Sequence, residues 1–501
     1  MSPTRPTTPD AAATEAPRLG TRVRRGLVWQ LMGRGGDQLV RLLANLVLAR
    51  LLAPEDFGLL GMAAAGLALA DAMAFVGTDQ AVMADRRGRR PRFVATAWAL
   101  SLIRGGVMSI ALLLLATPLA RGFGQPQAAG LFMLIALQPV IASLAHPGAF
   151  IPLRDLRFAR WTVMRLLAVV LGTGATIALA LHLRDARALV LGQLATTALS
   201  AAANLLITPR RVRVRPWIHR RHARGLLRFS AGAVGTPLLI MGVAQLPAVL
   251  IGPVLGPATL GVFAMLRRLC DTGQQLAVQA AGSVLVPTAA RLAEEPVRFA
   301  AAWTRSIRIT GLAALGSAGL LAWLGGDVPA TVLGPSFRGD AGLFSALAVA
   351  GGLAAVLGVM GPFFWGLARP DLDRIIQGIR LLAMAVAAVA LMPALGSLGV
   401  ALALAVSAAA AVLTAAVLMR RTRNITVHAT LTALGPGLVL GGGLWTAGAV
   451  IDTLAAPPSL VRLTIAAAAG LGIAGIWITP RMRRRLPARP RHAALATGVS
   501  S

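Results

Sequence analysis

The sequence predicts an all-α, polytopic membrane protein with about fourteen transmembrane helices. The chain of 501 residues is 56% hydrophobic and only 13% charged. Apolar stretches of about 20 residues recur from end to end, and each is long enough to cross the roughly 30 Å hydrocarbon layer of a bilayer. A phrase near the N-terminus returns about 200 residues later. We therefore expect a repeated unit of several hydrophobic helices rather than a water-soluble fold.

The expected helices are separated by connections whose charge alternates along the chain. All 49 basic residues are arginines: 35 fall on one side of the membrane together with both tails, six fall on the other side, and eight lie within spans. Because cytoplasmic loops carry the excess of basic residues, both termini are expected to be cytoplasmic. The predicted spans cover residues 26–49, 57–84, 93–120, 128–151, 161–182, 188–208, 226–251, 258–288, 304–325, 341–367, 375–393, 397–419, 431–451 and 460–479.

The phrase that repeats contains a short polar elbow between two apolar segments. Residues 48–62 hold Pro54, Glu55 and Asp56, which suit a turn followed by the first turn of a helix. Residues 255–265 repeat the leucine, proline, glycine and methionine of this stretch in the same order. Upstream, a second set of matches pairs Arg25-Gly26-Leu27, Gly33 and Gly36 with Arg224-Gly225-Leu226, Gly232 and Gly235.

The formal charge of +31 has two explanations. In a water-soluble protein it would indicate nucleic acid, and the stretch from Arg210 to Arg224, interleaved with Trp217, His219 and His222, could resemble such a patch. In a membrane protein basic loops set the orientation. A cytoplasmic linker that rests on anionic lipid headgroups then explains the same residues. We favour the second explanation and predict no nucleic-acid partner.

Neither a cofactor nor a metal site is predicted. The single cysteine, Cys270, rules out an intramolecular disulfide. The six histidines lack the spacing of metal ligands. The sequence shows no nucleotide-binding P-loop and no catalytic nucleophile motif. Any energy that the protein uses would therefore come from an ion gradient or from consumption of a product downstream.

Polar residues inside the first span lie on one helical stripe. Asp37 lies three residues after Arg34 and four before Arg41, and residues at these spacings are neighbours on a helix. An ionisable group at mid-membrane costs about 2.5–3.5 kcal/mol, so it needs a partner or a water-filled cavity. We therefore predict that span one lines a cavity with Arg34, Asp37, Gln38, Arg41 and Asn45.

Span eight carries a second stripe of the same kind. Arg267, Arg268, Gln274 and Gln275 lie within helical reach of Asp271. Arginine suits phosphate because its planar fork donates paired, charge-assisted hydrogen bonds. Glutamine and asparagine suit sugar hydroxyls because their amides both donate and accept. The two stripes together favour a cavity that attracts an anion.

Other interpretations of the intramembrane charges stay open. The arginine–aspartate sets could be self-satisfied pairs that brace helix contacts, although each holds two arginines to one aspartate. Asp71 and Asp79 in span two could relay protons or bind a coupling cation, or they could be polar residues of an interface. Four further arginines would extend toward the nearest membrane surface: Arg104, Arg165, Arg228 and Arg380.

Several stretches together resemble one family of transporters. They are Gly26-Leu-Val-Trp-Gln-Leu through Leu48-Ala-Arg-Leu-Leu-Ala-Pro-Glu-Asp-Phe-Gly58, Leu333-Gly334-Pro335-Ser336-Phe337 and Leu395-Gly396-Ser397-Leu398-Gly399-Val400-Ala401. Over about residues 20–480 the chain resembles the bacterial polysaccharide transporters, which are the O-antigen and exopolysaccharide flippases of the multidrug/oligosaccharidyl-lipid/polysaccharide exporter superfamily. The resemblance implies two pseudo-symmetric six-helix lobes around a cavity lined by the first two helices of each lobe. It also implies two extra C-terminal helices here.

On this basis the chain divides into six parts. They are a disordered cytoplasmic tail (1–25), an N-terminal six-helix lobe (26–208), a basic cytoplasmic linker (209–225), a C-terminal six-helix lobe (226–425), two extra transmembrane helices (426–480) and a basic cytoplasmic tail (481–501).

The resemblance implies an alternating-access flippase of the bacterial inner membrane rather than an enzyme. It would move a polyprenyl-diphosphate-linked oligosaccharide to the periplasmic leaflet for exopolysaccharide or O-antigen (lipopolysaccharide) assembly. Polymerase and co-polymerase proteins would be candidate partners, with membrane lipids around the chain. In this interpretation Arg34, Arg41, Arg267 and Arg268 hold the diphosphate, and Asp37 and Asp271 orient them.

Two other classes of protein compete with this interpretation. An ion-coupled multidrug exporter of the same superfamily would need exposed acidic residues to attract cations, and the arginine surplus argues against it. A membrane-embedded glycosyltransferase or polymerase generally needs a large periplasmic loop or an acidic catalytic motif. The longest outward loop, at about 326–340, is short and holds only Asp327 and Asp340.

Overall fold

The computed structural model describes residues 29, 32–33, 35–73, 82, 86–154, 158–233, 235–455 and 458–478, and these residues form helices and connections without a strand. A first helix covers residues 35–51. The other α-helices are α2 (Pro54–Met73), α4 (Pro91–Gly122), α5 (Ala129–Ile135), α6 (Gln138–Ser143), α7 (Ile151–Arg154), α8 (Phe158–Leu183), α9 (Ala186–Ile207), α10 (Arg220–Ala233), α11 (Gly235–Arg291), α12 (Pro296–Trp323), α13 (Asp327–Val332), α14 (Ala341–Gly366), α15 (Pro370–Leu395), α16 (Ser397–Arg423), α17 (Val427–Ala455) and α18 (Ser459–Ile478).

Each of the fourteen predicted spans overlaps a helical segment. Ten segments among the described residues are long and apolar enough to cross a membrane. The other four predicted spans fall on helix 35–51, α2, the second part of α11 and α18. α11 serves as two spans because its backbone breaks at Gly256 (φ 85°, ψ 168°), a conformation that is essentially limited to glycine. The prediction of an all-α polytopic fold is confirmed.

Two span boundaries differ from the prediction. The span predicted at 128–151 is interrupted, because α5 ends at Ile135 and α6 begins at Gln138 beside Pro139, whose ring cannot continue the hydrogen-bond ladder. The helix that contains the start of the span predicted at 226–251 begins earlier, because α10 covers Arg220–Ala233. Its arginines make the first half of α10 too polar for a bilayer core.

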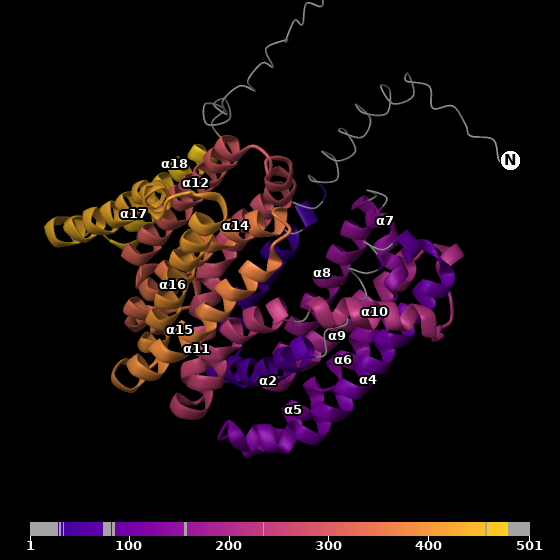
Figure 1. Cartoon of the computed structure of the whole chain (residues 1–501). Coiled ribbons are helices and arrows are strands. Elements are labelled where there is room, and N and C mark those ends of the chain that lie inside the picture. Colours follow the sequence, from indigo (N-terminus) through magenta and orange to yellow (C-terminus); the bar gives the residue numbers. More distant parts are fainter. Residues whose placement is uncertain are drawn as a thin grey trace, which may run out of the picture.

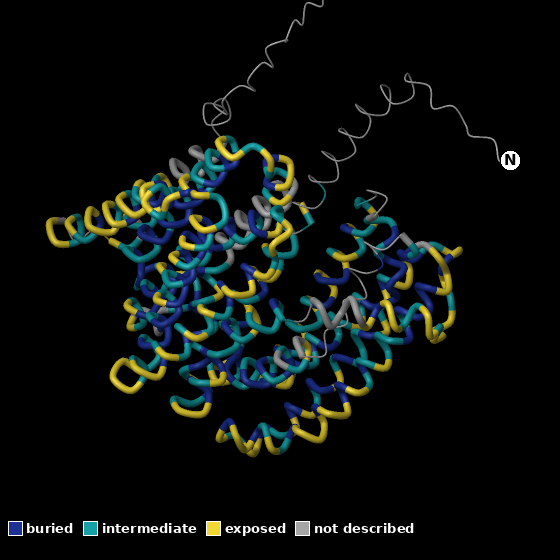
Figure 2. The backbone as a smooth tube through the Cα atoms, in the orientation of Figure 1, coloured by how far each residue is buried: buried dark blue, intermediate teal, exposed yellow. Residues whose placement is uncertain are grey.

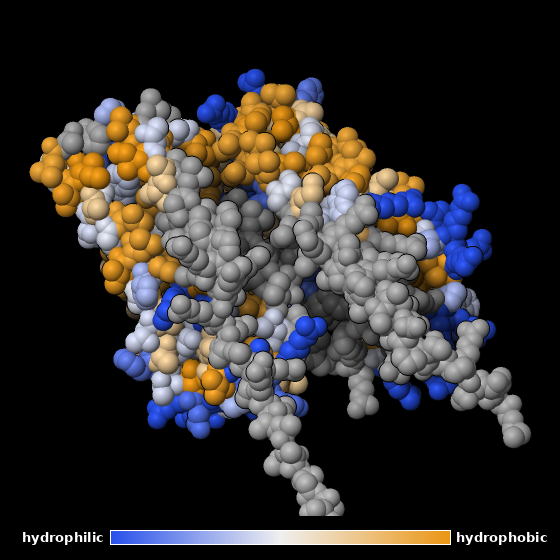
Figure 3. Space-filling view, turned by 90° about the horizontal axis from the view of Figure 1, so that it is seen from above, coloured by the Kyte–Doolittle hydropathy of each residue, from blue (hydrophilic) through white to orange (hydrophobic). Residues whose placement is uncertain are grey.

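Apolar side chains line the outside of the long helices. On α4, Ile103, Val107, Ile110 and Leu114 are exposed at spacings of three and four residues, so they form one stripe. A water-soluble protein rarely exposes so much contiguous apolar surface, whereas lipid chains cover it without penalty. Figure 3 shows apolar residues (orange) over much of the molecule's upper and left parts in that view, with hydrophilic residues (blue) mostly at its rim.

The helices form two groups that meet at α2 and α11. Figure 1 shows α4 to α10 on one side and α11 to α18 on the other. One apolar core joins residues of both groups, from Met62 on α2 to Phe263 on α11 and Phe344 on α14. A second core around Trp303 lies within the α11–α18 group alone. Figure 2 shows buried residues (dark blue) along the inside of that group.

Contacts between connections define an arginine side in the α4–α10 group. The backbone N–H of Trp217 donates to the carbonyl oxygen of Ala95 (3.3 Å), and Arg160 donates to the carbonyl oxygen of Leu206 (3.0 Å). The start of α4, the start of α8 and the segment after α9 therefore lie together. These are the connections in which the arginines gather.

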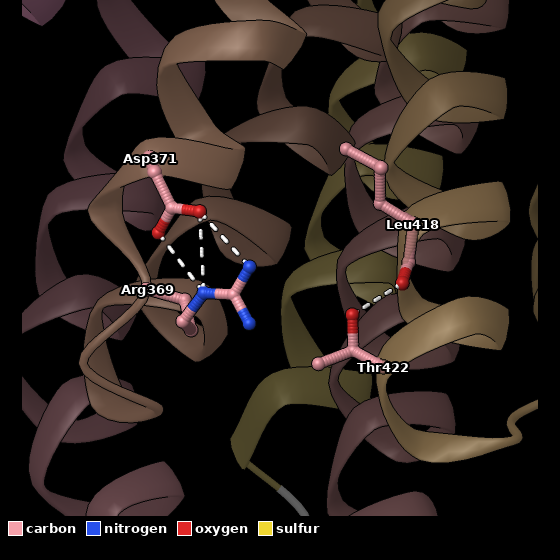
Figure 4. Close-up of polar contacts among 4 residues, drawn as sticks. All are labelled: Arg369, Asp371, Leu418 and Thr422. Atoms are coloured by element: carbon pink, nitrogen blue, oxygen red, sulfur yellow. Dashed lines mark hydrogen bonds and ion pairs between the residues drawn. The ribbon is translucent and has the colours of Figure 1, made fainter.

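The arginine side continues in the α11–α18 group. Between α14 and α15, Arg369 donates from Nε and Nη2 to both carboxylate oxygens of Asp371 at 3.0–3.2 Å (Figure 4). At the end of α16, the Thr422 hydroxyl donates to the carbonyl oxygen of Leu418 (2.6 Å; Figure 4). The guanidinium of Arg423 then lies 5.3 Å from the ring centroid of Phe299, at the start of α12.

The two repeated elbows lie on the opposite side and pack against each other. α2 begins at Pro54 as predicted, and Asp56 accepts a hydrogen bond from the backbone N–H of Ala53 (3.0 Å). A methyl group at Gly58 would overlap the carbonyl oxygen of Pro257, and one at Gly261 would overlap that of Pro54. These residues occupy matching positions of the repeat. The contact is therefore reciprocal, and glycine is required on both sides of it.

Candidate functional site

A polar cavity of about 420 Å³ lies between helix 35–51, α2 and both parts of α11. Six of the residues singled out from the sequence line it: Gln38, Arg41, Asn45, Arg267, Arg268 and Asp271. The remaining lining residues are Leu42, Gly61, Ala64, Ala244, Gln245, Pro247, Ala248, Leu260, Phe263 and Ala264. Both predicted stripes thus reach one cavity.

On helix 35–51, Asp37 connects two arginines. The Nε of Arg41 donates to Oδ1 of Asp37 at 3.0 Å, one helical turn away. Arg165 of α8 approaches the other carboxylate oxygen at 3.9 Å and lies over the ring of Trp161, 5.2 Å from its centroid. The arrangement fixes Arg41 at the cavity wall. It also corrects the expectation for Arg165, which reaches an intramembrane partner rather than extending to the surface alone.

The adjacent arginines of α11 point to two different helices. Arg267 donates to the carbonyl oxygen of Ala244 (3.1 Å) and lies 3.5 Å from a carboxylate oxygen of Asp271. Arg268 donates to Oδ1 of Asn45 on helix 35–51 (3.1 Å). Asn45 and Ala244 are separated by the same interval as the matched glycines Gly36 and Gly235. The arginines therefore reach equivalent positions on the first helix of each repeat.

The cavity wall carries a surplus of positive charge. Among the described residues that line it, three are arginines (Arg41, Arg267 and Arg268) and one is a carboxylate (Asp271). Two unit charges 4 Å apart interact by about 4 kcal/mol at an effective dielectric constant near 20. An anion between these guanidiniums would therefore be strongly favoured, and each contact could become a charge-assisted hydrogen bond.

A smaller and more apolar chamber of about 230 Å³ adjoins this cavity. Asn45 and Arg268 line both spaces, so their hydrogen bond lies at the boundary. Gln193 of α9 lines the chamber and donates to Oε1 of Gln138 on α6 (2.7 Å). The other side chains of the chamber are mainly apolar: Leu42, Leu46, Phe57, Leu60, Met265, Leu269 and Leu333.

The remaining candidates lie elsewhere. Asp71 does not line the cavity but faces Arg104 of α4 at 3.6 Å, so that arginine too has an intramembrane partner. Arg34 and Asp79 fall outside the described residues. The backbones of Gln274 and Gln275 belong to α11, and their side chains and that of Arg228 also lie outside what the structure describes.

Two residues near the cavity were missed by the sequence interpretation. Gln245 lines it next to Ala244, and the available signal was one amide within the otherwise apolar stretch 237–255. Arg380 of α15 interacts electrostatically with Arg267 and Asp271. Its Nε is buried without a hydrogen-bond partner in the part of the chain that the structure describes. Arg380 therefore does not extend to the surface, and it adds a further positive charge behind the cavity wall.

Among the described residues, no group of three or more His, Cys, Asp or Glu side chains is placed to hold a metal ion. The site is built instead from guanidiniums, amides and one lining carboxylate. This donor set can bind a phosphate-bearing, hydroxyl-rich ligand.

The chain is similar to known proteins in sequence and in fold. A model of the family described as "polysaccharide biosynthesis protein" matches residues 47–338, a range that includes Arg267, Arg268 and Asp271. The succinoglycan biosynthesis transport protein ExoT of Rhizobium meliloti (strain 1021) is 25% identical over 288 residues, and the match spans 58% of this chain and 58% of that protein.

Two solved structures share the fold. The lipid II flippase MurJ in an inward closed conformation superposes with a TM-score of 0.66 at 11% identity, covering 90% of this chain and 98% of that chain. An inward-facing multidrug resistance MATE family transporter of the MOP superfamily gives a TM-score of 0.58 at 18% identity, covering 82% and 96%. The family match extends over more than half of the sequence. This chain therefore belongs to the polysaccharide biosynthesis protein family and has the fold of MOP-superfamily transporters.

Proposed function

We propose that this protein is a flippase that moves a polyprenyl-diphosphate-linked oligosaccharide across a membrane by alternating access. One observation carries the proposal: arginines from two separate helices, Arg41 and the pair Arg267 and Arg268, converge on one intramembrane cavity. The family, the succinoglycan transport relative and the flippase fold support a transporter rather than an enzyme.

The diphosphate fits the arginine-lined wall. Arg268 donates to a neutral amide oxygen of Asn45, and a phosphate oxygen is a stronger acceptor for the same N–H groups. Asp37 holds Arg41 and Asp271 lies beside Arg267, so both carboxylates orient the cations without neutralising all of them. Arg34, at the preceding turn of the stripe, would add a further cation.

Sugar hydroxyls would meet the amides of the cavity. Gln38, Asn45 and Gln245 line it, and Gln274 and Gln275 follow Asp271 along α11. A volume of about 420 Å³ falls within the range of small-molecule pockets, about 300–1,000 Å³. It suits the diphosphate and the first sugar, while the prenyl chain remains in lipid.

The orientation follows from charge. With the arginine side in the cytoplasm, as the positive-inside rule requires, the elbows face the periplasm and the cavity receives its ligand from the cytoplasmic leaflet of the inner membrane. Both termini would then be cytoplasmic. The two six-helix lobes would rock about the cavity. Delivery of a repeat unit to the periplasm would make a polymerase and its co-polymerase the functional partners.

An ion-coupled multidrug exporter is the second candidate, because a MATE transporter shares the fold. Such an exporter needs carboxylates that attract cations. In the described part of the cavity the lining carboxylate, Asp271, already lies beside Arg267, and Asp71 faces Arg104. The charge of the site therefore favours an anionic ligand, and a coupling role for Asp71 or Asp79 would be additional to it.

Replacing the cavity arginines tests the proposal. In a strain that lacks the chromosomal gene, Arg41→Ala and Arg268→Ala should each lower surface polysaccharide at least about tenfold, because a hydrogen bond to a charged group contributes about 1.5–3 kcal/mol. Immunoblotting of membranes should show unchanged protein. Arg187→Ala is the matched control, since Arg187 is exposed and pairs with Asp185 away from the cavity. Normal polymer from both cavity variants would overturn the assignment, and altered drug susceptibility on deletion with intact polymer would favour the exporter.

A further inference from the structure

The segment between α9 and α11 must lie at a membrane surface. α9 ends at Ile207 and the next span begins at Gly235, so the residues between them connect two transmembrane helices on one side of the bilayer. The last part of this segment is α10 (Arg220–Ala233). We call residues 209–227 the linker surface.

The linker surface is strongly basic and has no acidic residue nearby in the sequence. All of its arginines are exposed: Arg210, Arg211, Arg213, Arg215, Arg220, Arg221 and Arg224. No aspartate or glutamate occurs between Asp185 and Asp271, and none of these arginines forms an ion pair with a described acidic residue. Burial and the charge of Arg87 hold the pKa of His222 below its usual range. Near neutral pH, His222 therefore adds little to the positive charge that the arginines give this surface.

Large apolar side chains are exposed among these arginines. Trp217 is 69% exposed, and Ile218 and Leu227 are also exposed. On α10, Leu227 follows Arg220 and Arg224 at helical spacing, so it shares their face. Leu226, on another face, is buried in a small core with Phe93. Tryptophan and aliphatic side chains beside arginines are typical of a helix that lies in the lipid interface.

The linker surface is fixed to the start of α4. The backbone N–H of His219 donates to the Thr96 hydroxyl (3.2 Å). The ring of His222 contacts that of Phe93, with centroids 5.7 Å apart. These contacts hold the inner face of α10 against protein, which leaves its arginine face directed away from the bundle. An ordered, basic, partly apolar surface beside two transmembrane helices is complementary to one partner, the anionic surface of the adjacent leaflet.

We propose that the linker surface binds anionic phospholipid headgroups, with Arg220, Arg221 and Arg224 on their phosphates and Trp217 inserted beside them. The interaction is independent of the cavity and of what the protein transports. It predicts that anionic lipid is enriched next to Trp217 relative to zwitterionic lipid. A basic residue near an anionic surface contributes about fivefold to the partition.

Fluorescence quenching in vesicles tests this enrichment. The full-length protein is reconstituted with dibrominated phosphatidylglycerol or dibrominated phosphatidylcholine over the same series of mole fractions. The contribution of Trp217 is the difference between the wild type and Trp217→Phe. Half-maximal quenching of Trp217 should need a mole fraction of brominated phosphatidylglycerol at least about fivefold lower than that of brominated phosphatidylcholine. The triple variant R220Q/R221Q/R224Q should lose this preference.

Two controls separate lipid binding from misfolding and from total charge. The triple variant R220K/R221K/R224K keeps the charge and should keep the preference. R291Q/R420Q/R421Q removes the same charge from exposed positions at the ends of α11 and α16, and it should leave quenching of Trp217 unchanged. Equal quenching by the two lipids, no quenching by either, or an unchanged R220Q/R221Q/R224Q variant would overturn the proposal. If the two brominated lipids quench Trp217 equally and added single-stranded RNA reduces this quenching, the surface would be assigned to nucleic acid instead.

Discussion

The hydrogen bond between Arg268 and Asn45 links the α11 helix to helix 35–51 at the boundary between two chambers. Because its acceptor is a neutral amide, an anionic ligand can replace Asn45 as the acceptor for Arg268. When the ligand binds Arg268 in this way, the contact between the two helices at this point is lost. An aspartate in place of Asn45 would change this balance, because it would compete with the ligand as a charged acceptor.

We therefore expect Asn45→Asp to weaken binding of a short prenyl diphosphate about tenfold, a difference of about 1.4 kcal/mol. Asn45→Ala removes this amide acceptor without adding a charge that competes with the ligand, so its affinity should stay closer to that of the wild type than to that of Asn45→Asp. Calorimetric titration of the detergent-solubilised protein with geranyl diphosphate measures both. Equal affinities of Asn45→Asp and the wild type would contradict this role of Arg268.

For single residues, the sequence predicted the contacts that helical spacing determines. Asp37 and Arg41 are one turn apart, and they pair as expected. The partners supplied by other helices, Arg165 and Arg380, could not be predicted, because only tertiary packing brings them to Asp37 and Asp271. The arginines at 267 and 268 also have alanines, Ala64 and Ala65, at the matching positions of the other repeat, so symmetry alone would have placed the charge wrongly.

Among the elements, α11 has the most unusual construction. It carries one cavity wall on each side of Gly256, whose backbone conformation (φ 85°, ψ 168°) is sparsely populated by other residues. No atom lies within 4 Å of the position that a Cβ would occupy there. The consequence of substitution is therefore backbone strain alone, without a steric clash.

Gly256→Ala should destabilise the protein by about 1–3 kcal/mol, the range for a residue held in such a conformation. The midpoint of thermal unfolding in detergent should fall, while Gly174→Ala in α8 should leave it unchanged or raise it. Gly174 is a suitable control because a Cβ there also meets nothing, but its backbone is helical and alanine is the better helix former. Equal midpoints for Gly256→Ala and the wild type would show that the break tolerates a side chain.

Element boundaries were predictable where hydropathy or a special residue determines them. α2 begins at Pro54, and α16 ends at Arg423, directly before Asn424, which adopts a left-handed conformation. The predicted span 226–251 includes the end of α10, because the leucines and glycines after Arg224 extend the apolar run. The burial of Leu226 with Phe93 is a tertiary contact, which no local pattern records.

For the whole molecule, the repeat predicted that the elbows are equivalent, and the structure shows in addition that they touch. Pro54 and Gly58 of one elbow contact Gly261 and Pro257 of the other, through glycines that cannot be enlarged without displacement. Leu60, two residues after Gly58, lines the apolar chamber behind this contact. The paired elbows are therefore placed to close the chamber from their side of the membrane.

A larger residue at either glycine should open this side. In a Cys270→Ala background with Leu60→Cys as the reporter, Gly58→Ala should increase labelling by a membrane-impermeant maleimide severalfold. Cys270 is the only cysteine of the sequence, so its removal leaves the reporter as the single thiol. Gly130→Ala in α5 is the control, because a Cβ there meets no atom within 4 Å. If both variants are labelled like the parent, the elbow contact does not control access to the chamber.

The reciprocity of the elbow contact also determines how the closure can fail. Movement that lifts Gly58 from the carbonyl of Pro257 lifts Gly261 from that of Pro54 as well, because the same two segments form both contacts. A rigid separation of the two segments therefore breaks both contacts together. Opening at this point is therefore cooperative, and the molecule should pass between a sealed and an open state without a half-open intermediate.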